Sequence, residues 1–99
     1  MLLECVPAWN GNWTSECFIA CCWQHGENER RLVAVNYAAN QSQCYVRLPF
    51  GDLRHHNVHL KDLTGPARYV REGQDLVDRG LYLDVPPWCY HVFELAPHE

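Results

Sequence analysis

Residues 31–48 read RLVAVNYAANQSQCYVRL and contain the two clearest β-strand patterns of the chain. Residues 32–37 are apolar on both alternating faces apart from Asn36, which is typical of a central strand covered on both sides. Residues 43–48 alternate apolar and polar side chains, which is typical of a half-buried strand. The intervening residues 39–42, Ala-Asn-Gln-Ser, tolerate a tight turn. The pattern therefore predicts a β-hairpin around which further strands are added.

Five other segments have strand patterns and are separated by turn signals. They are residues 16–24, 57–63, 67–71, 81–85 and 89–95. Strands recur about every ten residues and no segment keeps a 3.6-residue period, which predicts an antiparallel sandwich or small barrel. A buried amide must be hydrogen-bonded, so Asn36 is expected to hold a neighbouring turn or strand edge.

The domain prediction is a single unit over residues 1–99. We expect an irregular N-terminal segment over residues 1–15, a sandwich over residues 16–95 and a frayed tail over residues 96–99. Residues 25–29 are predicted to form a polar turn. Residues 75–79 are compatible with either one helical turn or an extended edge.

The composition excludes several classes of protein. The 99 residues, 47% of them hydrophobic, suit one ordered domain with a real core. The net charge is −4 and the basic residues are scattered among carboxylates, so no nucleic-acid partner is predicted. No run approaches the roughly 18 apolar residues of a membrane span, so no membrane partner is predicted. The N-terminus lacks the features of a secretion signal, and we expect a cytoplasmic location.

Six cysteines are a high number for this length. They are Cys5, Cys17, Cys21, Cys22, Cys44 and Cys89. All except Cys5 fall in predicted strands, where a small apolar residue would serve, so mostly free and buried thiols are expected. One or two disulfides are an alternative if the parent protein is exported. A zinc site is disfavoured because no Cys-x-x-Cys pair is present.

The common catalytic motifs are missing from the sequence. It has no glycine-rich phosphate loop and no Gly-x-Ser-x-Gly elbow. The carboxylate pairs, Asp75 with Asp78 and Glu27 with Glu29, are predicted in surface turns of a chain too small to form a glycosidase cleft. No catalytic residue and no cofactor are predicted.

The histidines offer a weaker metal hypothesis. On a strand, Cys89 and His91 would share one face, which suits metal ligation. His55 and His56 are predicted in a polar loop, and His59 is predicted to point outward from its strand. The simpler interpretation is that none of them holds a metal.

Two tryptophans near the N-terminus are candidate sugar-binding residues. Trp9 and Trp13 flank the residues Asn10-Gly11-Asn12 in a segment with no clear strand pattern. Aromatic faces in loops can stack on sugar rings, although packing against the domain or a neighbouring domain is the favoured interpretation. Trp23 and Trp88 lie in or beside predicted strands and are expected in the core or at its rim.

Four stretches carry a family resemblance. They are PAWNGNWTSECFIACCWQ (7–24), RRLVAVNYAANQSQCYVRLPF (30–50), LKDLTGPARYVREGQDLVDRGLYLDVPPW (60–88) and YHVFEL (90–95). In this order and spacing they resemble the C-terminal β-domain of α-amylase-like enzymes of glycoside hydrolase family 13. The sequence departs from that pattern at Cys21 and Cys22, and at Cys89, where such chains usually have glycine.

The resemblance implies an antiparallel Greek-key β-sandwich of about seven to eight short strands that follows a catalytic (β/α)₈ barrel. In that family the catalytic carboxylates lie on the barrel, and no stretch here matches their motifs. The implied function is a non-catalytic accessory domain that stabilises or positions the barrel, with residues 3–14 near the contact. Such a domain in isolation is expected to expose an apolar patch and to be able to self-associate.

Two alternatives stay open. The first is a stand-alone α-glucan-binding module that uses Trp9 and Trp13. The second is a small metal- or thiol-dependent protein, built on Cys21, Cys22, Cys44, Cys89 and His91.

Overall fold

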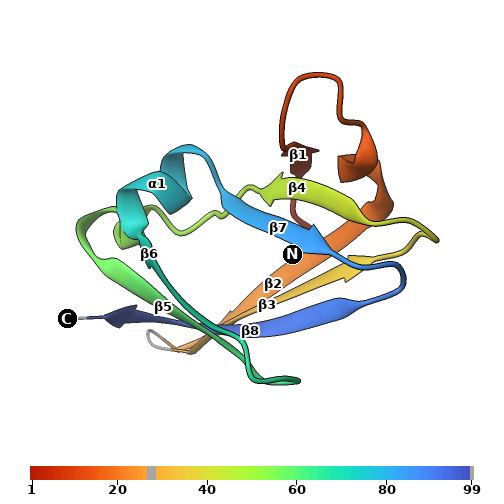
Figure 1. Cartoon of the computed structure of the whole chain (residues 1–99). Coiled ribbons are helices and arrows are strands. Elements are labelled where there is room, and N and C mark those ends of the chain that lie inside the picture. Colours follow the sequence, from red (N-terminus) through yellow and green to blue (C-terminus); the bar gives the residue numbers. More distant parts are fainter. Residues whose placement is uncertain (27–28, 99) are drawn as a thin grey trace.

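The computed structural model describes residues 1–26 and 29–98, in which eight β-strands form two antiparallel sheets (Figure 1). The larger sheet has the order β2 (Phe18–His25), β3 (Glu29–Asn36), β8 (Tyr90–His98), β5 (Asn57–Asp62) and β6 (Arg68–Glu72). The smaller sheet has the order β1 (Cys5–Pro7), β4 (Ser42–Val46) and β7 (Leu81–Val85). The two sheets enclose one apolar core, so the predicted antiparallel β-sandwich is confirmed.

Strands β5 to β8 follow the Greek-key order. β6 pairs with β5, and the chain then passes through the helix α1 (Gly73–Asp78) to β7 in the other sheet. β8 returns to pair with the free side of β5. The fourth strand therefore lies beside the first, as in a Greek key. β6 and β7 are edge strands of different sheets, so the sandwich is open between them.

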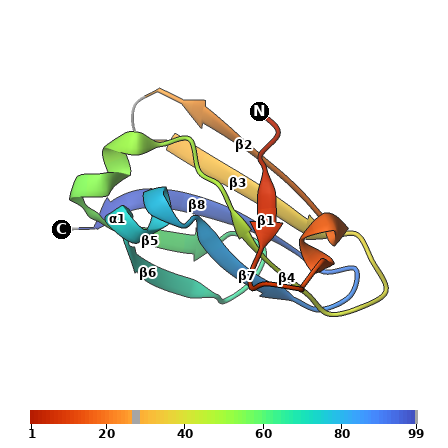
Figure 2. The same ribbon diagram turned by 90° about the horizontal axis from the view of Figure 1, so that it is seen from above.

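The predicted hairpin over residues 31–48 is wrong. β3 pairs with β2 and β8, whereas β4 pairs with β1 and β7, so the connection crosses from one sheet to the other. Figure 2 shows the smaller sheet lying over the larger one. β4 alternates as predicted, and β3 and β4 bury side chains in the same core from opposite sides. Alternation shows which side chains of a strand point inward, but it does not show which strand lies beside it. A connection between two sheets therefore has the same local sequence pattern as a hairpin.

Asn36 holds this crossing, as predicted for a buried amide. It is fully buried, and its Nδ2 donates to the carbonyl oxygens of Asn40 at 2.8 Å, Val85 at 3.0 Å and Pro86 at 3.1 Å. Its main-chain N–H donates to the carbonyl oxygen of Cys89 at 2.9 Å. This residue therefore joins the end of β3 to the end of β7 and to the loop before β8.

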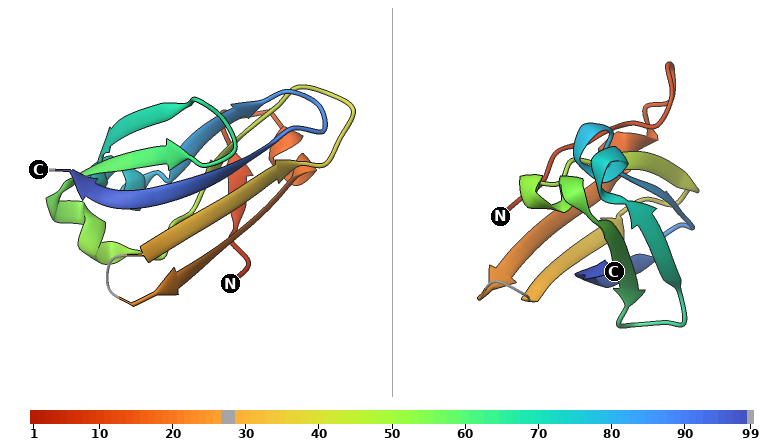
Figure 3. Two further views of the ribbon diagram at one scale, coloured as in Figure 1. Left: turned by 90° about the horizontal axis from the view of Figure 1, so that it is seen from below. Right: turned by 90° about the vertical axis from the view of Figure 1, so that its left-hand side faces the viewer.

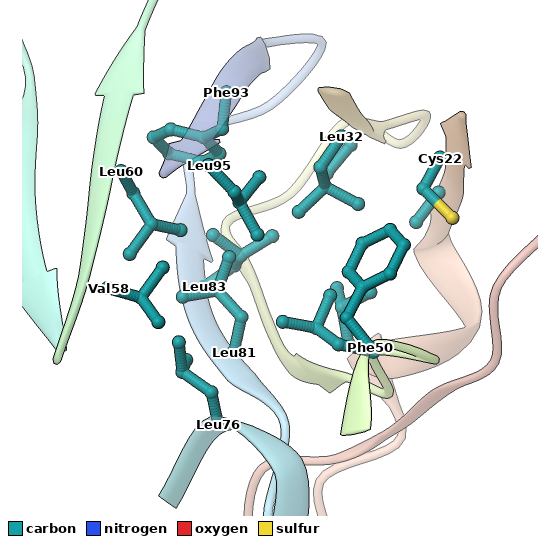
Figure 4. Packing of buried hydrophobic residues seen from close by; sticks show 14 of the residues in the cluster. Cys22, Leu32, Phe50, Val58, Leu60, Leu76, Leu81, Leu83, Phe93 and Leu95 are labelled. Atoms are coloured by element: carbon teal, nitrogen blue, oxygen red, sulfur yellow. The ribbon is translucent and has the colours of Figure 1, made fainter. Parts of the chain in front are cut away.

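Inward-facing side chains from both sheets form the core (Figure 4). The buried side chains alternate along each strand: Phe18, Ala20 and Cys22 in β2; Val58, Leu60 and Asp62 in β5; Leu81, Leu83 and Val85 in β7. β3 is central in its sheet, as predicted, but it is not covered on both sides. Leu32 and Ala34 are buried, whereas Val33 and Val35 on the opposite face are only half-buried.

The structure contradicts the predicted conformation of two segments. Residues 5–7, expected to be irregular, form the strand β1, which pairs with β4. β1 is an edge strand, where Pro7 is tolerated because its missing N–H faces away from the sheet. Residues 96–98, expected to be frayed, continue β8 because β5 offers pairing partners as far as Asn57. Residue 99 of that tail and residues 27–28 of the predicted turn lie outside the described residues.

The cysteines are less buried than predicted. Cys17 lies in a 3₁₀ helix, η1 (Thr14–Cys17), so β2 begins only at Phe18. Cys89 lies in the loop before β8. Cys22 and Cys44 are buried and Cys89 is exposed, while Cys5, Cys17 and Cys21 are half-buried. All six thiols are free, so the favoured free-thiol prediction agrees with the structure.

Most of the ambiguous residues 75–79 belong to α1, which packs against a second 3₁₀ helix, η2 (Gly51–His55). Gly73 at the start of α1 makes this contact possible. Its N–H donates to the carbonyl oxygen of His56 at 2.8 Å. A Cβ at Gly73 would overlap the carbonyl oxygens of Leu53 and His56. The close backbone approach therefore requires glycine.

We expect Gly73→Ala to lower the free energy of unfolding by about 3 kcal/mol, because the overlapped atoms are backbone atoms that cannot rotate away. Gly51→Ala is the matched control, since a Cβ at Gly51 meets no atom within 4 Å. We expect it to change stability by less than about 0.5 kcal/mol. Urea unfolding followed by circular dichroism compares the two, and equal stabilities would contradict the close contact.

Candidate functional site

The side of the larger sheet that points away from the core is apolar over β2, β3 and β8. We call this surface the outer face. It consists of Leu2, Ile19, Cys21, Val33, Val35, Leu63, Tyr90 and Val92. Figure 3, left, shows this side of the sheet, with no described helix or strand lying over it. The outer face exists because β2 and β3 carry apolar residues at both alternating sets of positions.

Strand register gathers these side chains into two neighbouring rows. In the first row, Ile19, Val35 and Tyr90 are successive cross-strand partners. The second row contains Leu2, Cys21, Val33, Val92 and Leu63. Directly opposed side chains on adjacent strands lie within contact distance, so the rows form one continuous apolar surface.

Several side chains of the outer face are widely exposed. Ile19 is 53% exposed, Tyr90 is 54% exposed and Leu2 is 76% exposed. Single exposed apolar residues are ordinary, but contiguous ones on adjacent strands mark interaction surfaces. The outer face is therefore the strongest candidate interface of the described residues.

A charged row borders the outer face at one end. Its members in cross-strand order are Trp23, Arg31, Glu94 and Lys61. The Arg31 Nη2 lies 3.9 Å from the Glu94 Oε2. Trp23 is 48% exposed, so it is a rim residue of this surface and not a core residue. An apolar centre with a polar, charged rim is the usual composition of a protein–protein interface.

The loop with Trp9 and Trp13 lies on the other side of the molecule, beside the smaller sheet (Figure 1). Trp9 is 54% exposed and Trp13 is 70% exposed. Asn12 between them is buried, and its Nδ2 donates to the Gln43 Oε1 at 2.9 Å. The Thr14 hydroxyl donates to the Asn12 Oδ1 at 2.7 Å and accepts from the Gln43 N–H at 2.9 Å. The loop is therefore anchored to β4 while it presents both indoles to solvent.

Trp88 is not a core residue either. It is 60% exposed and has a positive φ of 59°. Its ring packs edge-on against Tyr37, with ring centroids 5.5 Å apart.

A buried carboxylate pairs with a histidine inside the sandwich. The Asp62 Oδ2 lies 2.8 Å from the His91 Nδ1, and Asp62 is only 5% exposed. The Asp62 Oδ1 accepts hydrogen bonds from the Thr64 N–H at 3.0 Å and the Thr64 hydroxyl at 2.8 Å. Burial raises the pKa of Asp62, but the hydrogen bonds from His91 and Thr64 outweigh burial and leave this pKa below its ordinary value. The ionised carboxylate thus fixes both the turn after β5 and the ring of His91.

Since the folded-state pKa of Asp62 is lowered, its charge stabilises the fold above the unfolded pKa of about 3.9, and this stabilisation is lost as the pH falls through the lower folded pKa. We expect Asp62→Asn to lower stability at neutral pH by about 1–3 kcal/mol. The difference from the wild type should shrink at about pH 3. Urea unfolding at both pH values measures this.

Asp52→Asn is the control for this prediction. Asp52 forms a 2.9 Å ion pair with Arg30, but its side chain is 60% exposed. A pair of this kind contributes at most about 1 kcal/mol. A loss that is equal at both pH values would contradict the role of the Asp62 charge.

Two thiols of the smaller sheet lie close together. Cys5 on β1 and Cys44 on β4 are hydrogen-bonded through their side chains. This hydrogen bond lowers the pKa of Cys5 against the effects of burial and Glu4. The same hydrogen bond raises the pKa of Cys44, and burial adds to that rise. Cys44 is therefore a poor nucleophile in the folded protein.

The residues of the metal and thiol hypothesis are dispersed. Cys44 belongs to the smaller sheet, Cys21 and Cys22 point to opposite faces of β2, and His91 is engaged by Asp62. Within residues 1–26 and 29–98, no three His, Cys, Asp or Glu side chains gather as a metal site would require.

Asp75 and Asp78, considered above as a carboxylate pair, form separate surface ion pairs. The Asp75 Oδ1 lies 3.3 Å from the Arg79 Nε, and the Asp78 Oδ1 lies 2.7 Å from the Arg54 Nη1. Each carboxylate is thus paired with an arginine at the surface. Glu27 of the second predicted pair lies outside the described residues.

The sequence contains a signal for the outer face. Apolar residues at both alternating positions of β3 predict cover on both sides, whereas no described element covers the second side. The Asp62–His91 pair gave no recognisable signal, because 29 residues separate the partners and neither lies in a catalytic motif.

No helix in the described part of the chain is long and apolar enough to cross a membrane. Comparisons of the chain with family models, with curated proteins and with solved structures gave no match.

Proposed function

We propose that this chain is a non-catalytic β-domain of an α-amylase-like glycosidase, and that its outer face packs against the catalytic (β/α)₈ barrel. The exposed apolar outer face carries the proposal, since an isolated fold does not need it and a neighbouring domain would cover it. The barrel is proposed as the partner because of the sequence resemblance to family 13 enzymes. The rim of Arg31, Glu94 and Lys61 would supply the polar border of such an interface.

The outer face is a better candidate for the contact with the barrel than residues 3–14, which the resemblance indicates. The loop that contains Trp9 and Trp13 lies beside the smaller sheet, away from the outer face (Figure 1). The backbone of residues 1–3, however, pairs along the edge of β2, where the Leu3 N–H donates to the Ala20 carbonyl oxygen at 2.8 Å. The start of residues 3–14 therefore lies next to the proposed interface while the tryptophans do not.

We expect the chain to bind the barrel of a family 13 α-amylase prepared without its own C-terminal β-domain, and Ile19→Lys to weaken that binding at least about tenfold. The charge would lie in the middle of an apolar contact. Since Ile19 is 53% exposed in the free chain, Ile19→Lys should change the stability of the free chain by less than about 0.5 kcal/mol. Isothermal titration calorimetry measures the binding.

Tyr82→Lys is the matched control, because Tyr82 is a 44% exposed apolar side chain on β7 in the other sheet. It should bind the barrel as the wild type does. Equal weakening by both substitutions would contradict the assignment of the outer face. Absence of barrel binding together with a stable homodimer in sedimentation would show that the outer face serves self-association instead.

A second candidate function is α-glucan binding by Trp9 and Trp13. The observation in its favour is that both indoles are exposed on a loop that the buried Asn12 holds in place. Preorganised aromatic side chains bind without a large loss of conformational entropy.

If this candidate is correct, maltoheptaose should change the tryptophan fluorescence of the chain in a saturable way. Trp9→Ala and Trp13→Ala should each reduce the affinity about tenfold, because each removes one stacking surface. Trp88→Ala is the control, as Trp88 is similarly exposed at 60% but lies in another loop. An unchanged signal at millimolar sugar with folded protein would exclude this candidate.

A further inference from the structure

The gap between β6 and β7 contains a cavity of about 220 Å³. The cavity lies at the open edge of the Greek-key sandwich, where the two edge strands belong to different sheets. Its lining residues are Tyr69, Arg71, Leu81, Tyr82, Leu83, Asp84, His91 and Phe93. None of them belongs to the outer face or to the tryptophan loop.

The lining combines an apolar wall with unengaged polar atoms. Leu81, Leu83 and Phe93 are core residues that give the cavity its apolar side. The His91 ring lies parallel to that of Phe93, with centroids 5.2 Å apart. Its Nδ1 is bound to the buried Asp62, so its orientation is fixed, and its Nε2 has no protein partner among the described residues.

Two opposite charges lie at the cavity. The guanidinium of Arg71 rests over the ring of Tyr69 at 4.8 Å and donates to the carbonyl oxygen of Val70 at 3.1 Å. In the described part of the chain, no carboxylate pairs with it. The Asp84 Oδ1 accepts from the side chains of Gln41 at 2.8 Å and Gln43 at 2.9 Å. The Asp84 Oδ2 remains without a protein partner among the same residues.

The charged and polar groups at the cavity indicate which class of ligand it would bind. Asp84 and Asp62 disfavour an anion, and Arg71 disfavours a cation. The cavity instead offers donors and acceptors side by side, next to apolar and aromatic surface. A pyranose ring has the matching chemistry, since its hydroxyl groups both donate and accept and its C–H face is apolar.

The size limits the ligand to a single ring. Pockets for larger small molecules hold roughly 300–1,000 Å³, and this cavity is smaller. We propose that the cavity between β6 and β7 binds one neutral pyranose unit, with Arg71, Asp84 and the His91 Nε2 as hydrogen-bonding groups and Tyr69 or Tyr82 as the flanking aromatic surface. This site is separate from the proposed barrel contact, since none of its lining residues belongs to the outer face.

The test is a titration of the ¹⁵N-labelled full chain with methyl α-D-glucopyranoside, followed by amide chemical shifts. We expect saturable shifts confined to β6, β7 and the His91 region of β8. Arg71→Gln should weaken the affinity about tenfold, because it removes a charged hydrogen-bond donor. Arg68→Gln is the matched control, since Arg68 carries the same charge on β6 but does not line the cavity. It should leave the affinity unchanged.

Three results would overturn the proposal: no saturable shifts in the folded wild type, shifts confined to the loop of Trp9 and Trp13, or equal shifts with sodium acetate. The last result would identify an unspecific anion site at Arg71. Arg71 does not belong to the outer face, so failure of this titration and failure of barrel binding are distinguishable.

Discussion

One buried carboxamide decides how the two sheets of this domain are joined. Asn36 ends β3 inside the core, where an amide without hydrogen bonds would cost several kcal/mol. Its Nδ2 reaches three carbonyl oxygens, one in the crossing segment and two at the end of β7. These contacts hold the chain where it leaves the larger sheet and enters the smaller one. The sandwich, and not a larger single sheet, is the result.

The unequal sizes of the two sheets explain where the surface features lie. Three strands cannot close the sandwich edge next to β6, so a cavity remains between β6 and β7. The second side of β2, β3 and β8 has no layer of its own within the described residues, although its residues are apolar. Both proposed sites therefore follow from an incomplete enclosure of the larger sheet. The tightly packed η2–α1 pair, by contrast, depends on Gly73 and serves the fold.

The local alternation of apolar residues predicted most of the fold. In β2, β5 and β7 the buried side chains are those that share one alternating face, because a period of two describes the strand itself. It failed for the partners of β3 and β4, because a four-residue polar turn is compatible with a hairpin and with a crossing between sheets. It also failed for β1, whose three residues Cys5–Pro7 become a strand only by pairing with β4. The exposure of Trp9 and Trp13 agrees with their placement in a loop.

The sequence by itself determined the all-β class, the inward faces of the main strands and the buried role of Asn36, since these depend on neighbours along the chain. Only the tertiary structure decided which strands pair, which apolar face stays open and which polar groups meet at the sandwich edge. Asp62 and His91 come together because β5 and β8 are neighbours, and Arg71 and Asp84 line one cavity because β6 and β7 lie at the same open edge of the sandwich. These juxtapositions join residues that are distant along the chain, so no local period or motif contains them.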